Sequence, residues 1–133
     1  MPLIKITLAG HLPTAEQTRH LQGETTRLMH RILGKKAALT VVSVTSLPAP
    51  ALAAAGQALA ENAAAAYLEA FITAGTNSDG EKAAFITAAY ALLGSVIGQP
   101  AAPVYVILHD LPASNWGYDG QTQAARRSTN QPL

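Results

Sequence analysis

Apolar residues follow two different spacings along the first part of the chain. Residues 3–9 (LIKITLA) are rich in aliphatic and β-branched types and predict a strand. A helix should follow, because Thr14 and Gln17 have the spacing of a capping box and apolar residues then share one helical face as far as Gly34. The β-branched run 39–45 predicts a second strand. These signals together predict a β-α-β unit.

The same order of signals recurs in the second part of the chain. Residues 67–73 predict a strand, and Ser78 with Glu81 forms a second capping-box sequence. The helix that begins there should end at Gly98, and residues 104–109 predict the closing strand. We therefore expect a second β-α-β unit.

Short matches indicate that the two units are copies of one repeat. The matching positions lie 64 residues apart: Gly34 with Gly98, and Leu47-Pro48-Ala49 with Leu111-Pro112-Ala113. We expect one domain over residues 1–133, with internal repeats at 2–48 and 67–121. The alanine-rich segment 49–66 is interrupted by proline and glycine, and we interpret it as a linker with a short hairpin or helix.

The repeat predicts an α/β fold. Two strands joined by a helix of about five turns pair in parallel through a right-handed crossover. Two such units form a four-stranded sheet with both helices on one face. The strands carry apolar residues at both odd and even positions, for example Leu3 and Ile4, so the second face also needs to be covered. We therefore expect a symmetric oligomer.

Composition narrows the function classes. A chain of 133 residues with 49% hydrophobic residues can bury a core, and the absence of cysteine excludes thiol catalysis and zinc-thiolate sites. The net charge of +1 predicts no nucleic-acid or membrane partner. The four histidines lack metal-ligand spacing, so no metal is expected. The N-terminus resembles a strand and not a signal peptide, and we expect a cytoplasmic protein.

Pro2 is the first candidate for chemistry. It follows the initiator Met, whose removal would leave a secondary amine at the head of a strand. An α-amino group has a reference pKa of about 7.7–8.0, and burial lowers the pKa of an amine because the cation loses its hydration. Such a group could abstract a proton next to a carbonyl. From its position alone, Pro2 could equally be an N-terminal residue without a role.

The repeat, the N-terminal Met-Pro and the turn 116–120 (WGYDG) together resemble the tautomerase superfamily. Within it, the resemblance is to 4-oxalocrotonate tautomerase and to macrophage migration inhibitory factor, whose longer members carry two units per chain. The resemblance spans nearly the whole chain except 49–66. It implies a homotrimer, no cofactor, and a small enol or keto acid as substrate.

The resemblance also implies site residues. Pro2 matches the catalytic proline, and Trp116 matches the aromatic residue that forms an apolar wall beside it. Lys35 and Tyr105 match substrate-binding positions of the migration inhibitory factor branch. Asn115 could hydrogen-bond a substrate oxygen, and His11 stands where the 4-oxalocrotonate branch has a substrate-binding arginine. Structural roles stay open: a helix C-terminus for Lys35, the core for Tyr105 and a subunit interface for Trp116. We interpret Arg126 and Arg127 as two residues of a flexible C-terminal tail.

Three hypotheses follow. The first is a tautomerase in which neutral Pro2 moves a proton of an enol or 2-keto acid. The second is a hydratase, dehalogenase or decarboxylase in which cationic Pro2 works with an acid on an unsaturated or 3-keto acid. The third is a non-catalytic binding or scaffold protein, which a chain that retains Met1 would favour because its Pro2 nitrogen is an amide.

Overall fold

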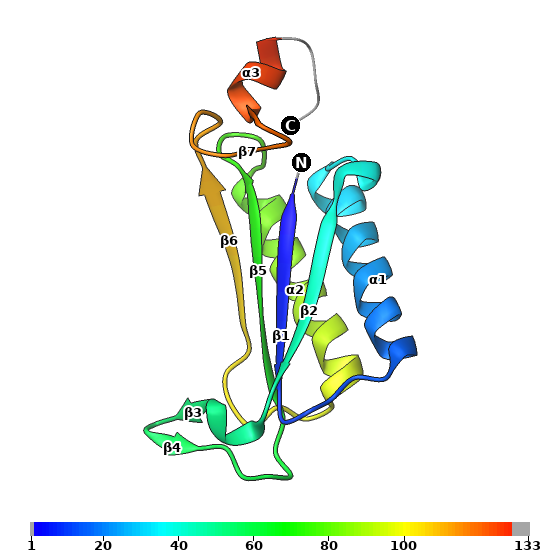
Figure 1. Cartoon of the computed structure of the whole chain (residues 1–133), viewed down its shortest axis with the longest axis vertical. Helices are drawn as coiled ribbons and strands as arrows, with labels where there is room; N and C mark the ends of the chain where they lie inside the picture. The colour runs from blue at the N-terminus through cyan, green and yellow to red at the C-terminus, as the bar shows by residue number, and fades with distance from the viewer. Residues whose placement is uncertain (1, 129–133) are drawn as a thin grey trace.

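The computed structural model describes residues 2–128. Four long strands form one mixed sheet, β1 (Leu3–Ala9), β2 (Val41–Leu47), β5 (Ala65–Thr73) and β6 (Tyr105–Leu111), in the order β2-β1-β5-β6. Two helices, α1 (Ala15–Leu33) and α2 (Asp79–Ile97), lie on the same face of this sheet (Figure 1). This arrangement confirms the predicted α/β architecture.

Each half of the sheet is a parallel β-α-β unit. β1 pairs in parallel with β2, and β5 pairs in parallel with β6. The two halves meet where β1 and β5 run antiparallel, with Leu3 opposite Phe71 and Ala9 opposite Ala65. As a result, the start of β1 and the ends of β5 and β6 lie at one end of the sheet, which is the upper end in Figure 1.

Both capping boxes form as predicted. The Thr14 hydroxyl accepts the amide of Gln17, whose side chain in turn accepts the amide of Thr14. Ser78 and Glu81 make the same reciprocal pair at the start of α2. These bonds satisfy amides that a helix start would otherwise leave without partners. The α1 helix ends at Gly34, as the sequence predicts.

The core lies between the sheet and the helices. Alternate strand residues such as Ile4, Ile6, Leu68 and Ile72 are fully buried there against residues of both helices, including Phe85. By length and composition, α2 could also cross a membrane. It is the most apolar helix described because its buried face packs into this core: Phe85, Ala89, Leu92, Leu93 and Val96.

Residues 2–128 leave the other face of the sheet uncovered. Large apolar side chains are exposed there at Leu3, Val41, Tyr105 and Ile107, with exposed fractions of 39%, 57%, 65% and 38%. They occupy the strand positions that alternate with the core residues, as expected for a sheet with apolar residues on both faces.

The segment 49–66 lies at the lower end of the sheet. It contains a 3-10 turn, η2 (Ala49–Ala51), and a short hairpin of β3 (Ala53–Ala54) and β4 (Gln57–Ala58). Ala49 and Leu59 pack with Ala9 and Ala65 in a second small core. Gly10 has a φ of 73° and lies so close to this segment that a Cβ would sit 2.0 Å from the Ala63 carbonyl oxygen.

The bounds of three strands differ from the sequence prediction. β5 begins at Ala65 rather than at Tyr67, because Ala65 and Ala66 pair with the end of β1 despite the low strand propensity of alanine. A 3-10 turn, η1 (Ala37–Leu39), delays the start of β2 to Val41. β6 runs on to Leu111 because it pairs with β5 as far as Thr73.

Candidate active site

Pro2 lies at the head of β1 and is buried. Its carbonyl oxygen accepts the amide of Val41 at 3.2 Å, which joins it to the start of β2. A cavity of about 170 Å³, the Pro2 cavity, opens here and is lined by six residues: Pro2, Leu3, Val41, Trp116, Gly117 and Tyr118. The structure thus brings together Pro2 and Trp116, two of the residues that the resemblance singled out. Apolar surroundings of this kind favour the uncharged form of an amine.

The wall of the Pro2 cavity opposite β1 and β2 is a tight hairpin of β7 (Gly117–Tyr118) and β8 (Gln121–Thr122). A Cβ on Gly117 would lie 1.9 Å from the carbonyl oxygen of Gln121, so only glycine allows this approach of the two strands. A helix of six residues, α3 (Gln123–Ser128), follows directly. Its first amide, on Gln123, donates to the Trp116 carbonyl oxygen at 2.9 Å and closes the hairpin.

Trp116 is held at both its backbone and its side chain. In addition to the backbone bond from Gln123, the indole Nε1–H donates to the hydroxyl oxygen of Thr73 at 3.2 Å. Thr73 is the last residue of β5 and is fully buried. The end of the central strand therefore fixes the aromatic wall of the Pro2 cavity.

Arg126 packs on the hairpin instead of extending into a flexible tail. Its guanidinium carbon lies 3.7 Å from the centroid of the Tyr118 ring, and its Nη2 donates to the Tyr118 carbonyl oxygen at 2.9 Å. The sequence prediction for this residue was wrong because nothing in the sequence shows that α3 folds back over the turn.

Lys35 lies at the same end of the sheet but does not line the Pro2 cavity. It is 4% exposed, and its Nζ donates to the hydroxyl oxygen of Thr76 at 2.7 Å. Burial lowers the pKa of the Lys35 ammonium below its usual 10.5, while the carboxylates of Asp110 and Glu81 act in the opposite direction. Within one chain, Lys35 therefore contacts the turn after β5, and its contact with a substrate stays a prediction.

Tyr105 lies at the far end of the sheet from Pro2. It pairs with Tyr67, which in turn pairs with Thr7, near the end of β1. Its ring projects from the uncovered face and borders a hollow of about 270 Å³ beside the β3–β4 hairpin. Within one chain the structure does not bring Tyr105 to Pro2.

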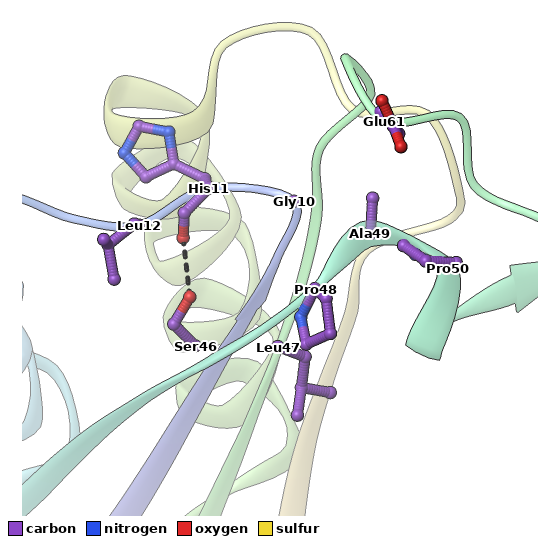
Figure 2. A pocket seen from close by; sticks show the side chains of 9 residues that line it. All are labelled: Gly10, His11, Leu12, Ser46, Leu47, Pro48, Ala49, Pro50 and Glu61. Atoms are coloured by element: carbon purple, nitrogen blue, oxygen red, sulfur yellow. Dashed lines mark hydrogen bonds between the residues drawn. The ribbon is translucent and has the colours of Figure 1, made fainter.

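His11 also lies at the lower end, just after β1. Its Nε2 is 3.0 Å from Oε1 of Gln17, and its carbonyl oxygen accepts the hydroxyl of Ser46 at 3.0 Å. His11, Ser46 and Glu61 line an open hollow of about 610 Å³. Figure 2 shows these three residues there. This hollow is larger than the Pro2 cavity, yet it lies at the opposite end of β1 from the proline.

Asn115 borders a different hollow, of about 320 Å³, on the outer side of the turn. Its backbone N–H donates to the Pro112 carbonyl oxygen at 2.8 Å. Trp116 lines this hollow as well as the Pro2 cavity. A contact of Asn115 with a substrate in the Pro2 cavity stays a prediction.

The side chains of Asp110 and Asp119 lie outside the Pro2 cavity. Asp110 forms an ion pair with Lys82 of α2, and it does not line the Pro2 cavity. Asp119, at the tip of the hairpin, does not line it either.

Within residues 2–128, no three histidine, aspartate or glutamate side chains gather closely enough to hold a metal ion.

Two residues important for the cavity were missed by sequence reasoning. Tyr118 lines it and had a signal, since it belongs to the aromatic turn 116–120. Thr73 had none, because a threonine at a strand end is an ordinary strand residue until the tertiary structure sets Trp116 beside it.

Solved structures provide a comparison for the fold. A symmetric trimer of wild-type fused 4-OT has a TM-score of 0.80 and 22% identity, over 92% of this chain and 97% of that chain. Pt0534 inactivated by 2-oxo-3-pentynoate has a TM-score of 0.79 and 23% identity over the same shares. The macrophage migration inhibitory factor-like protein of Entamoeba histolytica has a TM-score of 0.72 and 20% identity, over 91% of this chain and 97% of that chain.

Comparison of the sequence found no match: no family model and no curated protein matches the chain. The structural similarity nevertheless extends over about nine-tenths of the chain. The chain therefore has the fold of the fused 4-OT and macrophage migration inhibitory factor-like proteins.

Proposed function

We propose that the chain is a cofactor-independent tautomerase that uses the amine of Pro2, freed by removal of Met1, as its general base. The substrate would be a small enol or 2-keto acid. The observation that carries this proposal is the burial of Pro2 at the head of β1, where it opens on an apolar cavity walled by Trp116 and Tyr118.

The reaction follows from this placement. The neutral nitrogen accepts a proton from the enol oxygen or from the carbon next to the carbonyl, and returns it at the other position. Amine and substrate each end in their starting protonation state, so no co-reactant is needed. Trp116 would keep water from the amine during the transfer, which helps to keep the amine uncharged.

The comparisons support the substrate class. Pt0534 is inactivated by 2-oxo-3-pentynoate, which is a small 2-keto acid with a conjugated triple bond. A neutral amine can add to that triple bond, and the proton of the nitrogen then passes to the adjacent carbon. A cavity of about 170 Å³ admits an acid of this size.

The exposed sheet face supports a homotrimer. Leu3, Val41, Tyr105 and Ile107 expose apolar area on a face that the helices leave open, and fused 4-OT forms trimers. Tyr105 and His11 lie at the far end of the sheet, so they can reach only the Pro2 cavity of another copy. We propose that these two residues bind substrate across the subunit interface, whereas Trp116 acts within its own chain.

A hydrolytic reaction has less support. Hydration or decarboxylation with a cationic Pro2 needs an acid beside the amine, and no carboxylate of residues 2–128 lines the Pro2 cavity. The pH dependence of the rate separates the two mechanisms. The rate of a base-catalysed tautomerase rises with pH through the titration of the amine, whereas a reaction that needs the cation slows.

The experiment begins with the intact mass, because a chain that retains Met1 has no amine at Pro2. Protein without Met1 is then treated with 2-oxo-3-pentynoate and assayed for ketonisation of phenylenolpyruvate. We expect a mass increase equal to one reagent molecule on the N-terminal peptide, together with loss of activity. Pro2→Ala should lose most activity, whereas Pro13→Ala, in the loop before α1, should keep it. Full activity of a folded Pro2→Ala variant would contradict the proposal.

A further inference from the structure

Trp116 lines two cavities, the Pro2 cavity of about 170 Å³ and the hollow of about 320 Å³ beside Asn115. It is only partly buried, so packing alone does not enclose its side chain. A side chain that packing does not enclose can occupy more than one rotamer. A directional contact such as a hydrogen bond can then select one of them.

The indole of tryptophan has one hydrogen-bond donor and no acceptor, so a single bond can set the direction of its Nε1–H. Here that bond goes to the hydroxyl oxygen of Thr73, at 3.2 Å. Thr73 is fully buried at the end of β5, where β5 and β6 are still paired through Thr73 and Leu111. The acceptor therefore stands on the rigid sheet, whereas Trp116 stands at the start of a short hairpin.

Thr73 is held in turn by the residues that follow it. Its carbonyl oxygen accepts the hydroxyl of Thr76 at 2.6 Å, and Thr76 accepts the Nζ of Lys35 at 2.7 Å. Because the lysine donates to its oxygen, the Thr76 hydroxyl directs its own proton toward the Thr73 carbonyl. A buried cation at the end of α1 thus stabilises the backbone position that carries the acceptor for Trp116.

We propose that Thr73 is a positioning residue for the Pro2 cavity: its hydroxyl oxygen selects the orientation of the Trp116 indole that closes the cavity. Thr73 acts through Trp116 and does not line the cavity itself. Its importance for catalysis rests on the function proposed above. Its effect on the indole does not, because that effect can be observed without a substrate.

The test compares Thr73→Val, which replaces the hydroxyl by a methyl group of similar size, with Thr73→Ser, which keeps the hydroxyl. Trp116 is the one tryptophan of the chain, so its fluorescence reports on the ring directly. We expect the emission maximum to move in Thr73→Val and to stay at the wild-type position in Thr73→Ser. An unmoved emission in folded Thr73→Val would overturn the proposal, and so would an equal shift in both variants, which would assign the effect to packing.

The second readout is the effect of each substitution on KM and, separately, on kcat for phenylenolpyruvate. Loss of one hydrogen bond predicts an increase of KM of about three- to tenfold in Thr73→Val, with a smaller change in kcat and recovery in Thr73→Ser. In a Trp116→Phe background, which lacks the N–H donor, Thr73→Val should raise KM by less than about twofold. An equal increase in both backgrounds would show that Thr73 acts by another route.

Failure of this proposal is distinguishable from failure of the proposed function. If Pro2→Ala keeps full activity, the catalytic proposal is wrong, while the Trp116 emission still tests the positioning. If Thr73→Val does not fold, Thr73→Ser and Trp116→Phe remain to be compared. A wild-type KM and unchanged near-ultraviolet circular dichroism of the other aromatic residues in Trp116→Phe would then contradict the need for a held indole.

Discussion

The guanidinium of Arg126 lies against the ring of Tyr118, 3.7 Å from its centroid, and donates to the carbonyl oxygen of the same residue at 2.9 Å. A single side chain of α3 thus holds both the ring and the backbone of a residue that lines the Pro2 cavity. The hairpin, residues 117–122, does not belong to the main core. Its position should therefore depend on this contact.

We predict that Arg126→Ala loosens the hairpin and weakens substrate binding. A contact between a cation and a ring and a charge-assisted hydrogen bond together predict an increase in KM of about three- to thirtyfold. Arg127→Ala, the same change at the exposed neighbouring residue, is the matched control and should leave KM within about twofold of the wild type. Equal effects of the two variants would show that only the positive charge of α3 matters.

Gly117→Ala should distort the cavity wall. Its Cβ would lie 1.9 Å from the Gln121 carbonyl oxygen, so one strand of the hairpin has to move. Overpacking of this size costs about 1–3 kcal/mol, and we expect kcat/KM to fall by about ten- to a hundredfold. The midpoint of chemical denaturation should fall as well, because the same strain lowers the free energy of unfolding.

The matched control is the same substitution at Gly94. That glycine lies within α2 and has no neighbouring atoms within 4 Å of a built Cβ. Alanine is the better helix former, so Gly94→Ala should raise the free energy of unfolding by about 1 kcal/mol and keep activity. Wild-type kcat/KM in Gly117→Ala would contradict the described hairpin geometry.

The buried ammonium of Lys35 should make stability depend on pH. Its pKa in the folded chain is lowered, chiefly by burial, so the unfolded chain binds more protons between that lowered pKa and the usual 10.5. In this range stability rises with pH, because the fold no longer has to bury the charge. Below it, the full cost of burying the ammonium is present.

Lys35→Met removes this cost while keeping most of the apolar chain. We expect the variant to be as stable as the wild type or more stable at pH 7, and this advantage to shrink as the pH rises toward 10.5. Urea denaturation at several pH values measures the difference in stability at pH 7 and its change with pH. Lys36→Met, at the exposed next residue, controls for the loss of one positive charge. A constant difference between Lys35→Met and the wild type would refute the prediction.

Tyr105 provides a test of assembly. Its ring is 65% exposed within one chain, so Tyr105→Phe should leave the stability of the chain almost unchanged. If the hydroxyl reaches a neighbouring Pro2 cavity, KM should rise by about three- to tenfold. Tyr90→Phe, on the outer side of α2 and 50% exposed, is the control and should have no effect.

Mixed oligomers sharpen this prediction. Neither Pro2→Ala nor a more disruptive Tyr105→Ala variant should be fully active alone. Trimers assembled from both chains would regain some intact sites, because a cavity with Pro2 from one chain could receive Tyr105 from another. Absence of any recovery in confirmed mixed trimers would place Tyr105 outside the active site.

Much of the fold could be predicted from local sequence. Thr14 and Ser78 begin helices because their side chains satisfy amides within the same turn, and such contacts need no distant partner. The ends of the strands were harder to predict. Ala65 and Ala66 join β5 only because β1 provides partners for their backbone groups, and this pairing overrides their propensity.

The candidate site, like the fold, could be predicted from the sequence only in part. Pro2 could be singled out because its chemistry comes from its position in the chain, and Trp116 because the turn that carries it resembles the turn of the 4-oxalocrotonate branch. The antiparallel pairing of β1 with β5 decides which other residues join them. It brings Thr73 to the end of the sheet where Pro2 lies and places Tyr105 at the other end, where His11 follows β1.

The sequence by itself therefore determined the two β-α-β units, the helix caps and the candidate base, because each depends on neighbours within a few residues. Only the tertiary structure decided what surrounds that base. It buried Lys35 against Thr76, set the indole of Trp116 on Thr73 and folded Arg126 over Tyr118. Each of these contacts joins residues on different elements or across a turn, and side-chain packing selects them only once the sheet and helices are in place.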